Sequence, residues 1–344
     1  MAVLVAGYEH RTGEHCASTS LRNLMRFYGV EISEPMVVGL AAGLGFHYLR
    51  SQELSPTRMF HGRTATLEAD FCRNTGIPFE ERKETDDARA WAALRERLAA
   101  GVPVLIATDT YYLRYHRTTS HFPGHAAVAV GYDDDAETVL IADRKFEQYQ
   151  TCGFDELRRA RNADDYPMRC HNGYGEFLGE VKLQRSPELV RLALRRNADW
   201  MLAPSASGLT GIDAMRALAS DLPGWQQLDD WSWSARFGYQ VVVKRGAGGS
   251  FFRSLYADFL REAAELLPEI GSAGLPEQMD AIAAGWRGFA RVMQEQSERG
   301  ACDPALFAHA ATRVSELADL EESFFLQVGE LAGTRTATPA IDSH

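Results

Sequence analysis

Two short apolar runs separated by an acidic turn constrain the fold of this chain most strongly. Residues 126–132 (AAVAVGY) and 138–142 (TVLIA) flank the polar segment 133–137 (DDDAE). Short apolar runs on either side of such a turn are typical of a β-hairpin. A third run, residues 103–107 (PVLIA), follows a glycine and predicts another buried strand. The N-terminal half of the chain must therefore contain a sheet.

Helical periodicity surrounds these strands. The spacing of apolar residues from Leu21 to Tyr28 predicts a helix that begins at Cys16 and ends at Gly29. The same criteria predict one further strand at residues 239–244 and helices at residues 66–75, 86–100, 187–200, 211–222, 251–267, 276–298 and 304–331. We therefore expect an α+β domain over residues 1–183, a mostly helical domain over residues 184–333 and a disordered tail over residues 334–344.

Charge and apolar content exclude several classes of function. The 344 residues carry a net charge of −11, which argues against nucleic-acid partners because phosphate backbones require clustered Lys and Arg. No apolar run reaches the roughly 20 residues of a membrane span. The first residues lack a basic segment before an apolar one, so we expect a cytoplasmic protein.

The cysteine count is five, with no CxxC pair, which predicts neither a disulfide framework nor a structural zinc site.

One cysteine, Cys16, stands where a glycine-containing loop meets a predicted helix. A helix N-terminus presents unpaired N–H groups and a partial positive charge, and both stabilise a thiolate. The backbone N–H of Cys16 can also donate to an oxyanion that forms beside the sulfur. The position therefore predicts a nucleophile, whereas a buried structural cysteine is the plain alternative.

The predicted hairpin brings a histidine and an aspartate toward the same place. His125 begins the first strand, and Asp143 follows the second. A turn centred near Asp135 puts Asp143 opposite residue 127, diagonal to His125 on the same face. A carboxylate there accepts the Nδ1 proton of the imidazole and leaves the other nitrogen for the cysteine. Cys16, His125 and Asp143 are thus the predicted catalytic set.

This order and these contexts resemble papain-like cysteine peptidases, in particular the bacterial enzymes that trim double-glycine leader peptides. Those peptidases carry an oxyanion-hole glutamine six residues before the cysteine, a position held here by His10. The chain is more closely similar to the butirosin-biosynthesis acyltransferase (BtrH) family. The segments that carry this similarity are residues 13–23 (GEHCASTSLRN), 123–132 (PGHAAVAVGY), 244–253 (KRGAGGSFFR) and 256–260 (YADFL).

The resemblance implies a papain-like N-terminal domain followed by a mostly helical one. It also implies transfer of an acyl group from a carrier-protein phosphopantetheine thioester to an amine of a small natural product. Cys16, His125 and Asp143 carry over as the catalytic residues. The phosphopantetheine arrives on the carrier protein, so we expect no resident cofactor.

Other residues are weaker candidates, each with a plain structural reading. His10 and His15 are oxyanion-hole candidates or ordinary loop histidines. Candidates for contact with substrate or with the phosphopantetheine phosphate are Tyr111, Tyr112, Arg245, Gly246, Gly248, Gly249 and Arg253, which otherwise read as packing aromatics and a turn before a helix. No ligand spacing supports a zinc site built from His10, His15, Cys16, His121 and His125, so we expect no metal.

The leading hypothesis is an amide-forming cysteine acyltransferase with an acyl carrier protein, or another acyl thioester, and a small-molecule amine as partners. A papain-like hydrolase or cyclase is an alternative that uses the same residues. A binding protein that keeps the fold without catalysis is a third hypothesis. The apolar stripe along residues 304–331 serves either a domain core or a homodimer interface.

Overall fold

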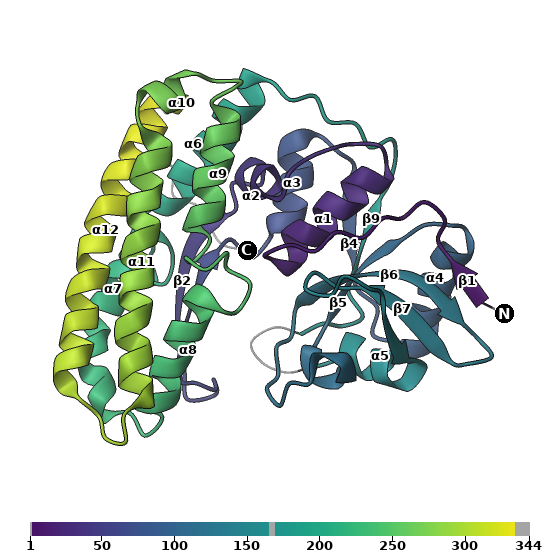
Figure 1. Cartoon of the computed structure of the whole chain (residues 1–344), viewed down its shortest axis with the longest axis horizontal. Coiled ribbons are helices and arrows are strands. Elements are labelled where there is room, and N and C mark those ends of the chain that lie inside the picture. The colour runs from purple at the N-terminus through teal and green to yellow at the C-terminus, as the bar shows by residue number, and fades with distance from the viewer. Residues whose placement is uncertain (1, 165–168, 334–344) are drawn as a thin grey trace. The chain divides into compact units, whose positions relative to one another are not determined.

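The computed structural model describes residues 2–164 and 169–333 (Figure 1). It has a mixed α+β fold with an antiparallel sheet and a helical C-terminal region, as the sequence predicted. The described residues form two compact units: the first lies within Met1–Val37 and Glu68–Gln184, and the second lies within Val38–Leu67 and Arg185–His344. This differs from the two consecutive domains expected from the sequence, because residues 38–67 pack with the C-terminal helices. The expected disordered tail lies outside the described residues.

The first unit contains the antiparallel sheet. Its strands lie in the order β4 (Phe79–Arg82), β9 (Tyr174–Phe177), β5 (Val104–Thr108), β6 (His125–Asp133), β7 (Thr138–Ala142) and β8 (Gln150–Gly153), and β1 (Ala2–Leu4) pairs with the far end of β6. The helical elements are α1 (Cys16–Phe27), α3 (Leu67–Thr75), α4 (Asp87–Ala99), α5 (Phe154–Arg161) and the 3₁₀ turns η1 (Thr110–Tyr112) and η2 (Arg114–His116). Helices α1 and α4 pack against β6.

The predicted hairpin is present as β6 and β7, and its register decides where the functional residues lie. Val128 pairs with Ala142, so Asp143 follows directly at the edge where β6 begins with His125. The β6–β7 register shifts between Ala129 and Gly131, and β1 pairs with residues 131–133 of β6, beyond the segment that pairs with β5. A side chain at Gly131 would collide with the carbonyl oxygen of Val3, so glycine is required at this close approach.

The second unit is a helical assembly around a two-stranded sheet. Strands β2 (Leu44–Arg50) and β3 (Arg58–Arg63) pair antiparallel. The helices are α6 (Pro187–Leu202), α7 (Gly211–Asp221), α8 (Trp231–Val243), α9 (Arg253–Ala263), α10 (Glu269–Ser272), α11 (Leu275–Glu298) and α12 (Pro304–Ala332), with the 3₁₀ segment η3 (Leu222–Gln227). The residues of α2 (Glu34–Leu40) are divided, residues 34–37 counting with the first unit and residues 38–40 with the second. Helices α6 and α7 cover β2, and α8 covers β3.

The strand predicted at residues 239–244 is wrong, because this segment completes α8. Its valines suggested a strand. However, the buried residues Phe237, Val241 and Val242 follow Ser234 at helical spacing and form one face against the sheet and α11. Tertiary packing of this face overrides the local preference of the β-branched residues.

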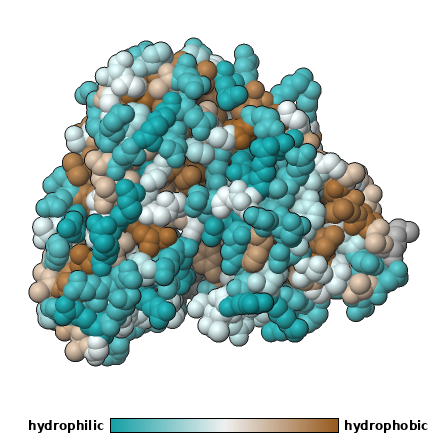
Figure 2. All heavy atoms as spheres, in the orientation of Figure 1, coloured by the Kyte–Doolittle hydropathy of each residue, from teal (hydrophilic) through white to brown (hydrophobic). Residues whose placement is uncertain are grey.

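The apolar stripe on α12 belongs to the core of its own unit. Phe307, Val314, Phe324 and Val328 are buried, and α12 packs against α6, α7 and α11. Hydrophilic side chains cover most of the face shown in Figure 2. No helix among the described residues is both long and apolar enough to cross a membrane.

A buried ion pair organises the second unit. Arg253 and Glu321 are both fully buried, and the guanidinium Nε and Nη2 donate to the two carboxylate oxygens at 2.9 and 2.6 Å. The remaining nitrogen, Nη1, donates to the carbonyl oxygens of Gly45, Gly62 and Phe251. The pair therefore joins α9 and α12 to both strands of the small sheet, with its hydrogen-bonding groups satisfied.

Removing one partner of this pair should strongly destabilise the protein. We expect Arg253→Ala to lower the free energy of unfolding by about 3–5 kcal/mol, because Glu321 would remain as an uncompensated buried charge. The matched control is Arg261→Ala on the same helix, whose ion pairs with Asp258 and Asp280 are exposed and should contribute less than about 1 kcal/mol. Urea denaturation measures the free energy of unfolding of both variants. Equal losses in the two variants would contradict the stabilising role assigned to the buried ion pair.

Candidate active site

Cys16 is the first residue of α1, as predicted, and its side chain is buried. His15 caps the helix: its backbone is extended, and its Nδ1 accepts the N–H of Ser18. With Nδ1 acting as an acceptor, a ring proton lies on Nε2, which is 3.7 Å from the Cys16 sulfur. The sulfur thus has the helix N-terminus and an imidazole N–H beside it.

A second carboxylate, which the sequence analysis missed, holds this loop. Glu34 is buried, and its oxygens accept four hydrogen bonds, from the N–H groups of Glu14 and His15 and from the hydroxyls of Ser18 and Thr19, at 2.8 to 3.0 Å. A side chain at Gly13 would collide with this cluster. The sequence did not predict that Glu34 holds this loop, because a lone glutamate at a helix start indicates no such role. Its effect is to fix the backbone that presents Cys16.

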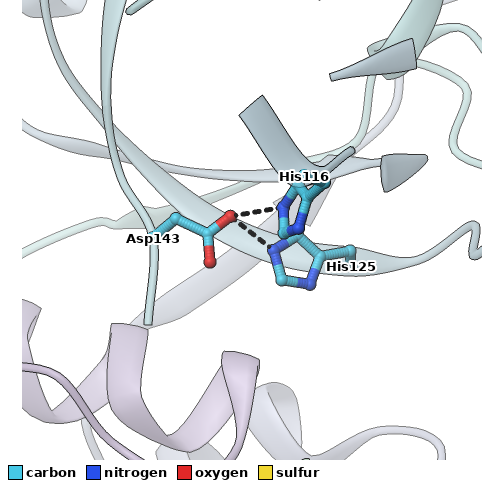
Figure 3. Close-up of side chains that lie close together, drawn as sticks. All are labelled: His116, His125 and Asp143. Atoms are coloured by element: carbon cyan, nitrogen blue, oxygen red, sulfur yellow. Dashed lines mark hydrogen bonds and ion pairs between the residues drawn. The ribbon is translucent and has the colours of Figure 1, made fainter. Parts of the chain in front are cut away.

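His125 and Asp143 meet at the edge of the sheet (Figure 3). The distance from His125 Nε2 to Asp143 Oδ2 is 2.8 Å, and both side chains are buried. The expectation that Asp143 accepts from Nδ1 is therefore wrong. A diagonal neighbour on the next strand is too distant for the nitrogen nearer the backbone, and the outer Nε2 makes the contact. Nδ1 is left for the sulfur of Cys16, whose pKa responds to a hydrogen bond with His125.

Two further side chains share the same carboxylate oxygen, and the sequence analysis assigned neither of them to the catalytic set. His116 Nε2 lies 2.8 Å from Asp143 Oδ2 (Figure 3), and the Tyr115 hydroxyl donates to it at 3.1 Å. Both residues come from η2, which begins at Arg114. A 3₁₀ turn carries no periodicity, so the sequence could not show which of its aromatic residues face inward.

The charges of this cluster support one another. Burial favours the neutral carboxyl, but the positive charge of His125 and hydrogen bonds from both histidines hold the pKa of Asp143 well below its usual range. Burial also opposes charge on His125, but Asp143 and Cys16 outweigh it and raise the pKa of His125 to about 10. Burial of Cys16 is likewise overcome, by its electrostatic interaction with His15 and by hydrogen bonds from His125 and His15, which lower its pKa well below that of an ordinary thiol. Both shifts favour a thiolate on Cys16 and an imidazolium on His125.

Three hydrogen bonds tie the loop before Cys16 to the loop after Asp143. His10 Nε2 donates to the carbonyl of Phe146 at 2.8 Å. The N–H of Gly13 donates to the carbonyl of Arg144, and the Arg144 guanidinium donates to the carbonyl of Glu14. The Nδ1 of His10 accepts from the Asn23 amide, so both ring nitrogens are engaged. His10 therefore bridges two loops, and of the two oxyanion-hole candidates it is His15 that directs an N–H toward the sulfur.

Tyr111 and Tyr112 lie on η1, and their rings contact His121. Tyr111 is 42 % exposed and stacks on this imidazole, whose Nδ1 lies 2.6 Å from Asp109. Arg159 lies over the ring of Tyr112. These contacts form an aromatic cluster of the first unit in which both tyrosines pack against His121.

The predicted phosphate-binding segment belongs to the second unit. Gly246, Gly248 and Gly249 all have positive φ and form the turn after α8. The next helix starts at Arg253, so this turn does not open directly into a helix N-terminus. Arg245 donates to the Gln240 side chain, and Arg253 is committed to the buried ion pair with Glu321. These contacts give both arginines structural partners.

Comparison with protein families adds independent information. Residues 15–144 match the family model described as Butirosin biosynthesis protein H, N-terminal, and residues 155–328 match a Domain of unknown function (DUF4872). The chain belongs to the BtrH-like family. This membership points to an enzyme related to butirosin biosynthesis, and the first match includes Cys16, His125 and Asp143. No curated protein matches the BtrH-like chain.

The charge state of the site predicts a selective reaction with alkylating agents. The pKa of Cys16 is lowered and that of His125 is raised to about 10. The thiolate should therefore persist at every pH between these two pKa values. An ordinary thiol is only a few thousandths ionised at pH 6. We expect iodoacetamide at pH 6 to label Cys16 rapidly, and His125→Ala to slow this labelling at least tenfold.

Peptide mass spectrometry identifies the labelled cysteine, and Cys152→Ala is the matched control. Burial raises the pKa of Cys152 to about 12, so its removal should change nothing. Labelling of Cys16 at the rate of a free thiol at pH 6 would contradict the ion pair.

Proposed function

We propose that the first unit carries a papain-like active site and that this BtrH-like protein is a cysteine acyltransferase. The observation that supports this most is the buried Cys16, held at a helix N-terminus with a lowered pKa beside a charged His125. A thiolate attacks a thioester in a nearly isoenergetic exchange, so an acyl-enzyme forms without a nucleotide. We propose an acyl carrier protein, or another acyl thioester, as the donor and a small-molecule amine as the acceptor.

The first half-reaction transfers the acyl group to the enzyme. The Cys16 thiolate attacks the thioester carbonyl, and the resulting oxyanion accepts hydrogen bonds from the backbone N–H of Cys16 and from His15 Nε2. As the C–S bond to the donor breaks, the departing thiolate takes the Nδ1 proton of His125. The products are acyl-Cys16, a free thiol and a neutral imidazole, so charge and protons balance.

The second half-reaction restores the ion pair. An amine attacks the acyl-Cys16 carbonyl, and the neutral His125 accepts the proton that the amine loses. The C–S bond to Cys16 breaks and the amide departs. Asp143 keeps the His125 ring oriented throughout and stabilises its charged form. The proposal needs no resident metal or cofactor, because the phosphopantetheine belongs to the carrier protein.

Intact-protein mass spectrometry with a panel of acyl thioesters tests the proposal. We expect a covalent adduct on the wild-type chain that Cys16→Ala abolishes and that Cys302→Ala, which changes another free cysteine, retains. Asp143→Asn should slow adduct formation without abolishing it, because Asp143 orients His125 and does not attack.

The fate of the adduct distinguishes the related reactions. Decay only when an amine is added supports transfer, whereas release of free acid in water would indicate a hydrolase. Release of a product lighter than the free acid by one water, as a cyclic amide is, would indicate a cyclase. The absence of any adduct with every thioester, together with slow alkylation of Cys16, would favour a binding protein without catalysis.

A further inference from the structure

The side chains around Asp143 converge in a way that the acyl-transfer mechanism does not require. His125 Nε2 and His116 Nε2 each lie 2.8 Å from the same oxygen, Asp143 Oδ2. Among the described residues, these three offer ligand atoms that all lie within 4.8 Å of one another. Orienting one imidazole needs one acceptor and no second histidine, so His116 is an additional feature of the cluster (Figure 3).

The second carboxylate oxygen strengthens this observation. Asp143 is fully buried, yet within residues 2–164 and 169–333 its Oδ1 atom has no hydrogen-bond partner. A buried acceptor without a partner is unfavourable unless another group satisfies it. The carboxylate therefore keeps one unpaired oxygen, while its other oxygen lies beside two imidazole nitrogens. Two imidazole nitrogens and a carboxylate are the donor set of a nitrogen- and oxygen-binding metal ion.

From this convergence we propose that His116, His125 and Asp143 form a binding site for a divalent transition-metal ion of the Zn²⁺ type. Two imidazoles and one carboxylate, with an open fourth position, are a common protein environment for Zn²⁺. Tetrahedral ligands about 2.0–2.2 Å from the ion lie roughly 3.3 Å apart. The present separations of 2.8 Å would open by about half an ångström as the ion replaced the two Nε2 protons.

The ion would regulate the same site, and this consequence depends on the proposed function. Coordination through Nε2 leaves His125 with a single proton position, Nδ1, so the ring could no longer alternate between its neutral and doubly protonated forms. Cys16 hydrogen-bonds to His125, and Asp143 contacts the Nε2 atom of that ring, so we assign the sulfur to the Nδ1 side, where it is not a ligand in this arrangement. Zn²⁺ would therefore inhibit acyl transfer while leaving the sulfur unbound.

Metal binding can be measured without any activity assay. We expect the wild-type chain to compete for Zn²⁺ with a chromophoric chelator, and Cys16→Ala to bind within about threefold of wild type. His116→Ala should weaken binding at least tenfold. His121→Ala is the matched control, because His121 pairs with a different carboxylate, Asp109, and its removal should leave binding unchanged.

Co²⁺ gives a spectroscopic test whose first result is measured on the wild-type chain. The proposed site contains only nitrogen and oxygen donors, so Co²⁺ should produce weak visible bands and no thiolate-to-cobalt charge-transfer band in the near ultraviolet. A charge-transfer band that vanishes in Cys16→Ala would overturn the proposal, as would binding that His116→Ala and His116→Gln leave unchanged. Acyl-adduct formation by metal-free protein is independent of these results, so the two proposals can fail separately.

Discussion

A single buried carboxylate governs the chemistry of this molecule. Asp143 has no exposed surface, and burying an isolated charge is too unfavourable to persist without compensation. The compensation comes from His125, which gains a proton and stays charged. That charge in turn stabilises the Cys16 thiolate. Proton positions at three residues thus follow from the placement of one aspartate at the end of β7.

The backbone keeps this electrostatic arrangement in place by local contacts. Glu34 fixes the loop before Cys16 through four hydrogen bonds, and His10 joins that loop to the one after Asp143. Both contacts use side chains outside the reacting set. The second unit repeats the same physical principle in a structural context, since Arg253 and Glu321 are buried together with their hydrogen-bonding groups paired. In both units a buried charge is therefore used where several segments must meet.

The sequence was most informative where local patterns determine structure. The helix at Cys16 and the hairpin that follows His125 were predicted from periodicity and turn composition, and both are present. The predicted alignment of Asp143 with residue 127 also agrees with the register, but two differences cancel to produce it. Asp133 pairs with Thr138, so the turn is one residue longer than a turn centred on Asp135, and the irregularity before Gly131 restores the alignment.

Features that depend on tertiary packing were beyond sequence reasoning. Asp143 contacts Nε2 of His125, and this depends on the distance across two strands. The contact of His116 with Asp143 depends on a 3₁₀ turn without periodicity. Residues 38–67 carried no composition signal for the strands they form in the second unit. Arg253 looked like a phosphate ligand in a glycine-rich segment, whereas its partner Glu321 lies 68 residues away in the chain.

The charge state of His125 is the most direct test of this account. Nitrogen-15 NMR of the histidine side chains at pH 7.5, with His125→Gln to assign the signal, reports whether each ring nitrogen carries a proton. The account predicts an imidazolium with protons on both nitrogens, because the pKa of His125 is raised to about 10. A neutral ring at that pH would contradict the thiolate–imidazolium pair on which the proposed chemistry depends.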